Sequence, residues 1–148
     1  MSPREVDWRT VNAKLDLIRR RLNTLSSLGK VETTWWDDDE ASALVVERVL
    51  IHIVDLAVDI NNHAAAVELG QVADDYKASF PLAARAGIIS RELAQALGPS
   101  AGTRNVLVHD YLEVDRDKVV LAATLALDQY GEYVRQVAAW AQNRSGGR

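Results

Sequence analysis

Residues 104–111, which read RNVLVHDY, bring together side chains that can do acid–base chemistry. Histidine has an unperturbed pKa of about 6.5, so His109 can move a proton at neutral pH. Arginine is always charged and binds phosphate oxygens in pairs, so Arg104 can stabilise negative charge that grows on phosphorus. Together they match the needs of RNA cleavage by attack of the internal 2′-hydroxyl.

The spacing of these residues limits how they can act together. Asn105 and His109 are four residues apart and share one face of a helix, so the Asn105 amide could fix the tautomer or orientation of the imidazole. Arg104 and His109 diverge by about 140° on a regular helix. They converge only if the helix ends or distorts near 108–110, or if the stretch meets its copy from a second chain. From spacing alone, a surface arginine and a C-capping histidine are the favoured interpretation.

The sequence favours a site without a metal or a cofactor. The chain has no cysteine and only three histidines. His52 and His63 are eleven residues apart on one predicted helix, about 16 Å by rise alone, and no His-x-x-x-His pair exists. The acidic run DDDE at 37–40 is interpreted as a helix start, because acidic residues suit the first turn of a helix.

The composition is that of one globular domain. The chain has 148 residues, of which 48% are hydrophobic and 26% charged, with a formal net charge of −4. This charge argues against a general nucleic-acid coat but permits a nuclease with local positive charge. No N-terminal apolar run resembles a signal peptide, and charged residues interrupt the longest apolar region, 41–60. We expect a cytoplasmic protein that does not enter the membrane.

Apolar periodicity predicts an all-α, up-down bundle of four to five helices, in a single domain that spans 1–148 with a flexible tail at 144–148. The first helix carries one apolar stripe and is ended by Gly29; a polar, β-prone link, VETTWW, follows it. A second helix of roughly 25–30 residues starts at DDDE. The other expected features are a helix over 73–86, an N-cap at Ser90, a bend or break at Gly98-Pro99-Ser100, and a last helix over 117–143.

The second helix is apolar nearly all round but carries one polar stripe. Its members are spaced at steps of four, three, four and three: Arg48, His52, Asp55, Asp59, and Asn62 or His63. Unpaired buried polar groups cost about 1–3 kcal/mol each, so the stripe is expected to face partners or a wet cleft. An internal hydrogen-bond network or dimer seam and a functional cleft are equally favoured; in the latter case Asp59 is a candidate contributor.

The run AGTRNVLVHDYLEVD resembles the Arg-x4-His-x-Tyr signature of the HEPN superfamily, and more narrowly the HepT-like toxins encoded beside minimal nucleotidyltransferase antitoxins. Residues 59–63 and 75–90 resemble further family segments, so the resemblance covers most of the chain. The sequence departs from the family at Thr103, where an aromatic residue is frequent, and at Pro81 and Pro99, where family helices usually continue.

The resemblance implies an all-α homodimer in which the motifs of two protomers line one cleft. It implies a metal-independent endoribonuclease, with an RNA substrate, in which Arg104 holds the phosphate, His109 is the acid or base and Asn105 orients His109. It also implies a second partner, a cognate minimal nucleotidyltransferase antitoxin that neutralises the toxin by adding AMP to Tyr111. Such a group would add bulk and charge two residues from His109.

Two other functions stay open from the sequence. The chain could be a non-catalytic HEPN binding protein that serves as docking partner and nucleotidyl acceptor of a nucleotidyltransferase, which the acidic balance favours mildly. It could also be a generic four-helix interaction module. The basic run 19–21 is interpreted as a solvated helix face, with a contact to RNA or a partner as the alternative.

Overall fold

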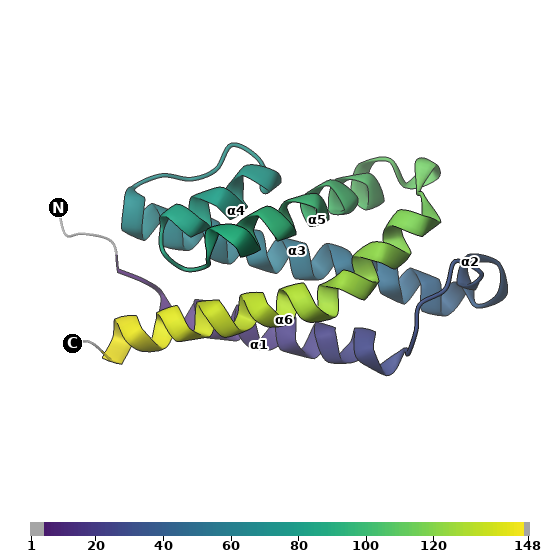
Figure 1. The fold of residues 1–148 in the computed structure, drawn as a ribbon, viewed down its shortest axis with the longest axis horizontal. Coiled ribbons are helices and arrows are strands. Elements are labelled where there is room, and N and C mark those ends of the chain that lie inside the picture. Colours follow the sequence, from purple (N-terminus) through teal and green to yellow (C-terminus); the bar gives the residue numbers. More distant parts are fainter. Residues whose placement is uncertain (1–4, 147–148) are drawn as a thin grey trace.

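The computed structural model describes residues 5–146, and the regular elements in this part of the chain are all helical (Figure 1). The elements in chain order are α1 (Trp8–Ser27), α2 (Trp35–Asp38), α3 (Glu40–Leu69), α4 (Tyr76–Arg85), α5 (Arg91–His109), the 3-10 turn η1 (Tyr111–Glu113) and α6 (Arg116–Gly146). The predicted all-α class is confirmed. Residues 144–146, which the sequence assigns to the tail, continue α6, and residues 147–148 lie outside the described part.

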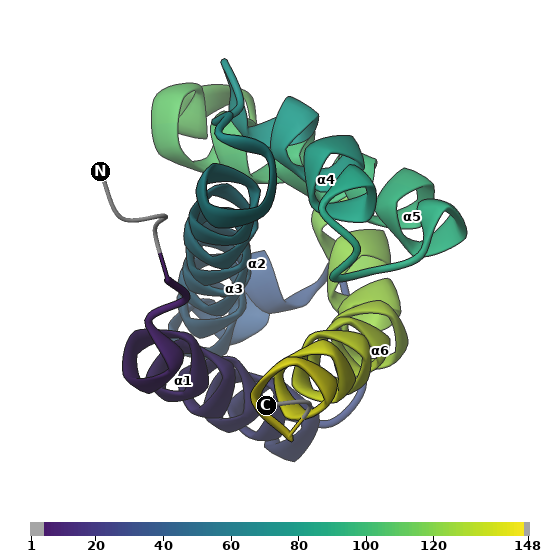
Figure 2. The ribbon, with the colours of Figure 1, turned by 90° about the vertical axis from the view of Figure 1, so that its left-hand side faces the viewer.

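The helices α1, α3, α4, α5 and α6 are arranged around one apolar core (Figure 2). Each of α1, α3, α4, α5 and α6 packs against the next, and α6 closes the ring by packing against α1. The largest fully buried side chains come from several of these helices, among them Leu15, Ile53, Phe80, Leu97 and Tyr133. Because the hydrophobic effect scales with buried apolar area, this shared core holds the helices that carry the polar residues in a fixed arrangement.

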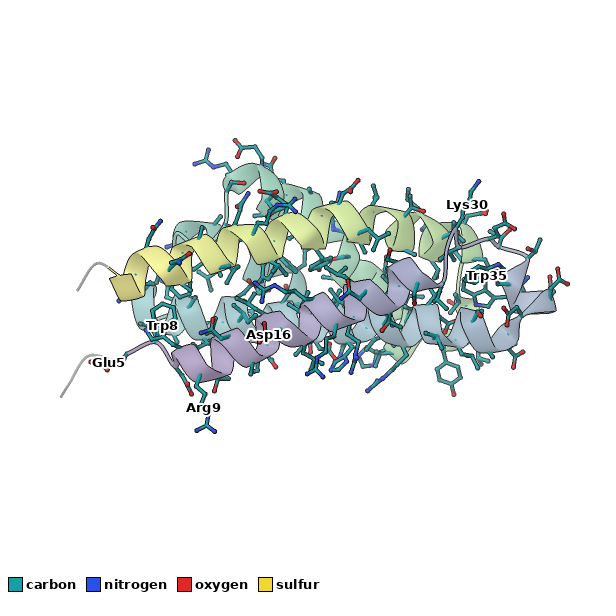
Figure 3. All side chains as sticks on the ribbon, turned by 90° about the horizontal axis from the view of Figure 1, so that it is seen from below. Glu5, Trp8, Arg9, Asp16, Lys30 and Trp35 are labelled. Carbon is teal, nitrogen blue, oxygen red and sulfur yellow. The ribbon has the colours of Figure 1, made fainter. Side chains whose placement is uncertain are left out.

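The first helix forms as its sequence pattern predicts. Val11, Leu15, Ile18 and Leu25 are buried, and the Asp7 side chain caps the helix by accepting a hydrogen bond from the backbone N–H of Thr10. Trp8 lies beside α6 with its ring centroid 5.1 Å from that of Trp140, whereas Arg9 points away from the bundle (Figure 3). The chain leaves α1 through Gly29 at φ +81°, a left-handed conformation that favours glycine.

The acidic run 37–40 is a helix start, as predicted, but only in its second half. Asp39 caps α3 by accepting from the backbone N–H of Ser42. Asp37 and Asp38 instead end the one-turn helix α2, so Trp35 and Trp36 at the end of the expected VETTWW link are helical, whereas residues 31–34 do link the helices. Tertiary contacts override local propensity here, because the Trp36 indole packs against the core and donates to Glu47 at 2.6 Å.

Of the bend or break expected at Gly98-Pro99-Ser100, the break was wrong, because α5 runs through these residues as one helix. Pro99 removes the backbone bond to the carbonyl of Gln95, but both residues are exposed, so water can satisfy that carbonyl. The Ser100 hydroxyl donates to the carbonyl of Leu97 at 2.6 Å. The predicted cap at Ser90 is confirmed, and the helix that carries the 104–111 motif is therefore one unit fixed at its start.

Two features are absent from residues 5–146. In this range no helix is long and apolar enough to cross a membrane. Nor do these described residues include a group of three or more histidines and carboxylates placed to hold a metal ion.

A buried hydrogen-bond network ties α3, α4 and α6 together. The Tyr133 hydroxyl donates to the side-chain oxygen of Asn61 at 2.7 Å, and the Asn61 amide donates to the hydroxyl of Ser79 at 3.1 Å. All three side chains are fully buried, and burial raises the pKa of Tyr133 well above its usual range. Tyr133 therefore stays neutral and serves packing, and the network fixes where α4 sits on α3.

Replacing Tyr133 with phenylalanine is expected to lower the free energy of unfolding by about 1–3 kcal/mol, because the Asn61 oxygen would be left buried without a donor. Urea unfolding of the two proteins measures the difference. The matched control is Tyr111→Phe, which changes an exposed tyrosine and should shift stability by less than about 0.5 kcal/mol. Equal effects of both variants would contradict the role of the network.

Candidate functional site

The motif residues lie on the last two turns of α5 and just beyond them. Arg104 faces the neighbouring helices, whereas Asn105 and His109 are exposed on the same face of α5. His109 is the last residue of the helix, and Asp110 caps it through its backbone N–H on the carbonyl of Val106. Tyr111 lies in η1 and is 68% exposed. Because α5 stays helical through His109, Arg104 and His109 leave it about 140° apart within one chain.

Three helices converge on the guanidinium of Arg104. Its Nε donates to Oδ1 of Asp55 on α3 at 2.8 Å. Its Cζ lies 4.3 Å from the ring centroid of Tyr76 on α4, a cation–π geometry. Its Nη1 donates to the side-chain oxygen of Asn105 at 3.3 Å. These contacts fix the position of a side chain that is only 15% exposed.

The guanidinium of Arg104 keeps free donors in this arrangement. Arginine has five N–H groups, of which one is used by Asp55 and one by Asn105. Nη2 has no hydrogen-bond partner among the described residues, yet it is not buried, so it is open to solvent. Two N–H groups suffice for a bidentate contact, in which each donates to one oxygen of the same phosphate. The site therefore presents an Arg104–Asp55 ion pair in which the guanidinium is held in place and still has N–H groups free to donate to a phosphate.

Tyr76 supports this cation without competing for its charge. Burial raises the pKa of Tyr76, and the nearby Asp55 carboxylate raises it further, against the opposing effect of Arg104. The phenol stays neutral at physiological pH, so its ring offers a π face to the Arg104 guanidinium. The Asp55 carboxylate accepts a hydrogen bond from Nε at the edge of the same guanidinium.

Asp59, the candidate cleft contributor from the polar stripe, does not contact Arg104. It pairs with Nζ of Lys14 on α1 at 3.1 Å, and its side chain is 57% exposed. The contact to Arg104 comes from Asp55, one helical turn earlier. The stripe pattern included Asp55, but periodicity alone does not show which of two acidic residues on a face meets the neighbouring helix.

The polar stripe of α3 lies at the surface and not inside a buried helix, and most of it joins α3 to its neighbours. His63 accepts from the backbone N–H of Asp7 at 2.9 Å, and Asn62 accepts from the backbone N–H of Ala73 at 3.0 Å. With the Asp59–Lys14 pair, these are separate hydrogen bonds and not the single internal network that was one of the two interpretations. The other half of the stripe, from Arg48 to Asp55, lies next to Arg104.

An apolar groove of about 520 Å³ opens beside the motif, between α3, α5, η1 and α6. Gly102 and Val106, which line it, lie on the same face of α5 as His109. Val106, Leu121 and Leu125 are all exposed there. Apolar side chains grouped in this way on a surface are typical of a contact with another molecule.

Comparison with known proteins places this chain in a family. The model of the family described as Ribonuclease HepT-like matches residues 13–137. A tRNA nuclease HepT of Aphanizomenon flos-aquae is 34% identical over 128 residues, which cover 86% of each chain. An mRNA nuclease HepT of Shewanella oneidensis is 29% identical over 82 residues, 55% of this chain and 62% of that protein.

Solved structures share the fold. A tri-AMPylated HEPN toxin of Shewanella oneidensis, in complex with MNT antitoxin, has a TM-score of 0.77 at 23% identity and covers 88% of this chain and 97% of its own. A cytosolic protein of unknown function, YutE of Bacillus subtilis, has a TM-score of 0.81 at 12% identity and covers 94% and 93%. At these identities the structures show the fold, and the family model and the 34% identical relative show the family: the chain belongs to the HepT-like ribonucleases.

Proposed function

We propose that this chain is the toxin of a type VII-like toxin–antitoxin pair and a metal-independent endoribonuclease. The observation that carries the proposal is the oriented guanidinium of Arg104, with free N–H groups, on the helix that also presents His109 to solvent. The names of the relatives, a tRNA nuclease and an mRNA nuclease, support RNA as the substrate class.

Cleavage follows from the chemistry of these two side chains. The 2′-hydroxyl of the RNA attacks the adjacent phosphorus, the bond to the 5′-oxygen breaks, and a cyclic phosphate forms. A neutral imidazole can take the proton from the 2′-hydroxyl, and a protonated one can give a proton to the 5′-oxygen. The Arg104 guanidinium stabilises the charge on the phosphoryl oxygens. In the single chain the side-chain oxygen of Asn105 accepts from Arg104, and in the proposed active unit its amide N–H groups orient His109, one turn further along α5.

The proposed active unit is a homodimer. Within one chain Arg104 and His109 point about 140° apart, so neither side chain can reach the phosphate held by the other. A two-fold axis near the end of α5 would place Arg104 of one protomer beside His109 of its partner. The apolar groove next to the motif supports this arrangement, since a second copy would cover the exposed Val106, Leu121 and Leu125.

The test of the proposal is RNA cleavage by the purified protein in the presence of EDTA, beside His109→Ala and Arg104→Ala. Cleavage by the wild-type protein, with no cleavage by either variant, supports the ribonuclease function. If all three preparations cleave equally, a contaminating nuclease explains the activity and the proposal fails. If none cleaves, the chain is instead the non-catalytic docking partner of a nucleotidyltransferase.

Tyr111 is the proposed modification site for a cognate nucleotidyltransferase antitoxin. Its side chain is 68% exposed, so a modifying enzyme can reach it without unfolding the bundle. The AMPylated HEPN toxin among the structural neighbours supports this assignment. An AMP phosphate on Tyr111 would repel RNA and compete for Arg104.

Incubation with the cognate nucleotidyltransferase and ATP is expected to raise the intact mass by one or more AMP units, and Tyr111→Phe should remove the increase. His109→Ala is the control, because it loses cleavage but keeps the acceptor hydroxyl. An AMP adduct on Tyr111→Phe would place the modification elsewhere.

A further inference from the structure

Three basic side chains form a cluster beside Arg104: Arg21 of α1 and Arg48 and His52 of α3, here called the α1–α3 basic cluster. Arg48, His52 and Asp55 follow one another at steps of four and three residues, so they share a face of α3. Nε of Arg21 donates to Nδ1 of His52 at 3.0 Å. The cluster thus joins α1 to the half of the polar stripe that reaches Arg104.

The contact with Arg21 fixes the protonation of His52. A guanidinium N–H can only donate, so Nδ1 of His52 is an acceptor and the ring proton is on Nε2. Burial lowers the pKa of His52, and the charges of Arg21 and Arg48 lower it further, with only Asp55 acting in the opposite direction. Nε2 has no partner among the described residues and is not buried, so it is a free donor open to solvent.

The two arginines of the cluster have no carboxylate partner in the described part of the chain. Arg21 bonds only to the neutral imidazole, and Arg48 is exposed and forms neither an ion pair nor a hydrogen bond there. The positions three and four residues from Arg48 on α3 hold Leu44, Val45, Ile51 and His52, none of them acidic. Asp55, the nearest acidic residue of the stripe, is engaged with Arg104.

The cluster extends the cation of the motif along α3. Asp55 of α3 holds Arg104, and His52, about 4.5 Å nearer the start of α3, holds Arg21. Arg48 lies about 6 Å nearer the start of α3 than His52. Three guanidinium groups and one imidazole N–H therefore line successive turns of one face. In a chain of net charge −4, two arginines without a described carboxylate partner, Arg21 and Arg48, beside the free N–H groups of Arg104 are a local exception that matches a chain of phosphates.

We infer that the α1–α3 basic cluster binds the phosphates of single-stranded RNA next to the one held by Arg104. The inference rests on the proposed ribonuclease function. It adds contacts to the RNA sugar–phosphate backbone that the motif at 104–111 does not itself supply. The contacts are to phosphate oxygens, so they position the RNA without reading its sequence.

Salt-dependent RNA binding tests the inference in the His109→Ala protein, which binds a single-stranded RNA oligonucleotide without cleaving it. In this background Arg48→Gln is expected to raise Kd about 3- to 10-fold at low salt. It should also reduce the slope of log K against log salt by about 0.7, the value for one phosphate contact on a single strand. Arg21→Gln together with Arg48→Gln should reduce the slope by about twice as much.

Arg91→Gln is the matched control, because it removes the same charge from an exposed arginine at the far end of α5, thirteen residues or about 20 Å from Arg104. It should change Kd less than two-fold. In the catalytically intact protein, Arg48→Gln should raise KM for the same oligonucleotide more than it lowers kcat.

Equal Kd values and salt slopes for Arg48→Gln and Arg91→Gln would overturn the inference. So would an Arg48→Gln protein that binds RNA normally but loses binding to the cognate nucleotidyltransferase, because the cluster would then be a protein interface. Failure of the proposed function has a different signature, since either no preparation would cleave RNA or cleavage would survive His109→Ala, whatever residue stands at position 48.

Discussion

Alanine at position 109 is expected to lower the rate of RNA cleavage by about 10²- to 10⁴-fold, the usual contribution of a positioned acid or base. His109 ends α5 and is exposed, and no hydrogen bond within residues 5–146 involves its side chain. Its loss therefore removes proton transfer without opening the core. Single-turnover cleavage of a defined RNA, with protein in excess and EDTA present, measures the rate of the chemical step.

Two controls make the His109→Ala result specific. Thermal unfolding of the variant should match that of the wild type, because an exposed side chain at a helix end contributes little to stability. Arg104→Lys should also cleave slowly, since lysine keeps the charge but lacks the planar fork and the Nε–H that bonds to Asp55. A His109→Ala protein with full activity would exclude the imidazole from the chemistry.

A mixture of two inactive chains is expected to regain activity. When Arg104→Ala and His109→Ala chains form a heterodimer, one of its two composite sites combines the intact Arg104 of one chain with the intact His109 of the other. Random pairing at equal amounts makes half of the dimers heterodimers, each with one of two sites restored. Mixed chains should therefore recover up to about a quarter of wild-type activity, while each variant alone stays inactive.

The complementation assay needs subunits that exchange, so the chains are best co-expressed with two different tags and the heterodimer purified through both. The double variant Arg104→Ala/His109→Ala, paired with either single variant, is the matched control and should stay inactive. If the purified heterodimer of the single variants has no activity, each site lies within one chain, and the two-fold arrangement is excluded.

Much of the architecture follows from local sequence, because helix ends depend on nearby residues. The acidic run 37–40 and Ser90 were recognisable as helix starts, although only the structure shows that Asp39 is the capping residue. The apolar stripe of α1 specifies its buried face without knowledge of the partner. Gly29 occupies a left-handed position that other residues rarely adopt. Pro99 misled the prediction, because whether a proline breaks a helix depends on whether solvent can satisfy the carbonyl that loses its donor.

The candidate site divides in the same way. The sequence by itself determined which residues carry the chemistry, since Arg104, His109 and their spacing are covalent facts, and it predicted that the two diverge on one helix. Only the tertiary structure decided that Asp55 and not Asp59 holds Arg104, that Tyr76 lies against the guanidinium, and that Arg21 meets His52. Each of these contacts joins two different helices. The packing of the shared core sets which turns of neighbouring helices face one another, and the periodicity of a single helix does not specify that pairing.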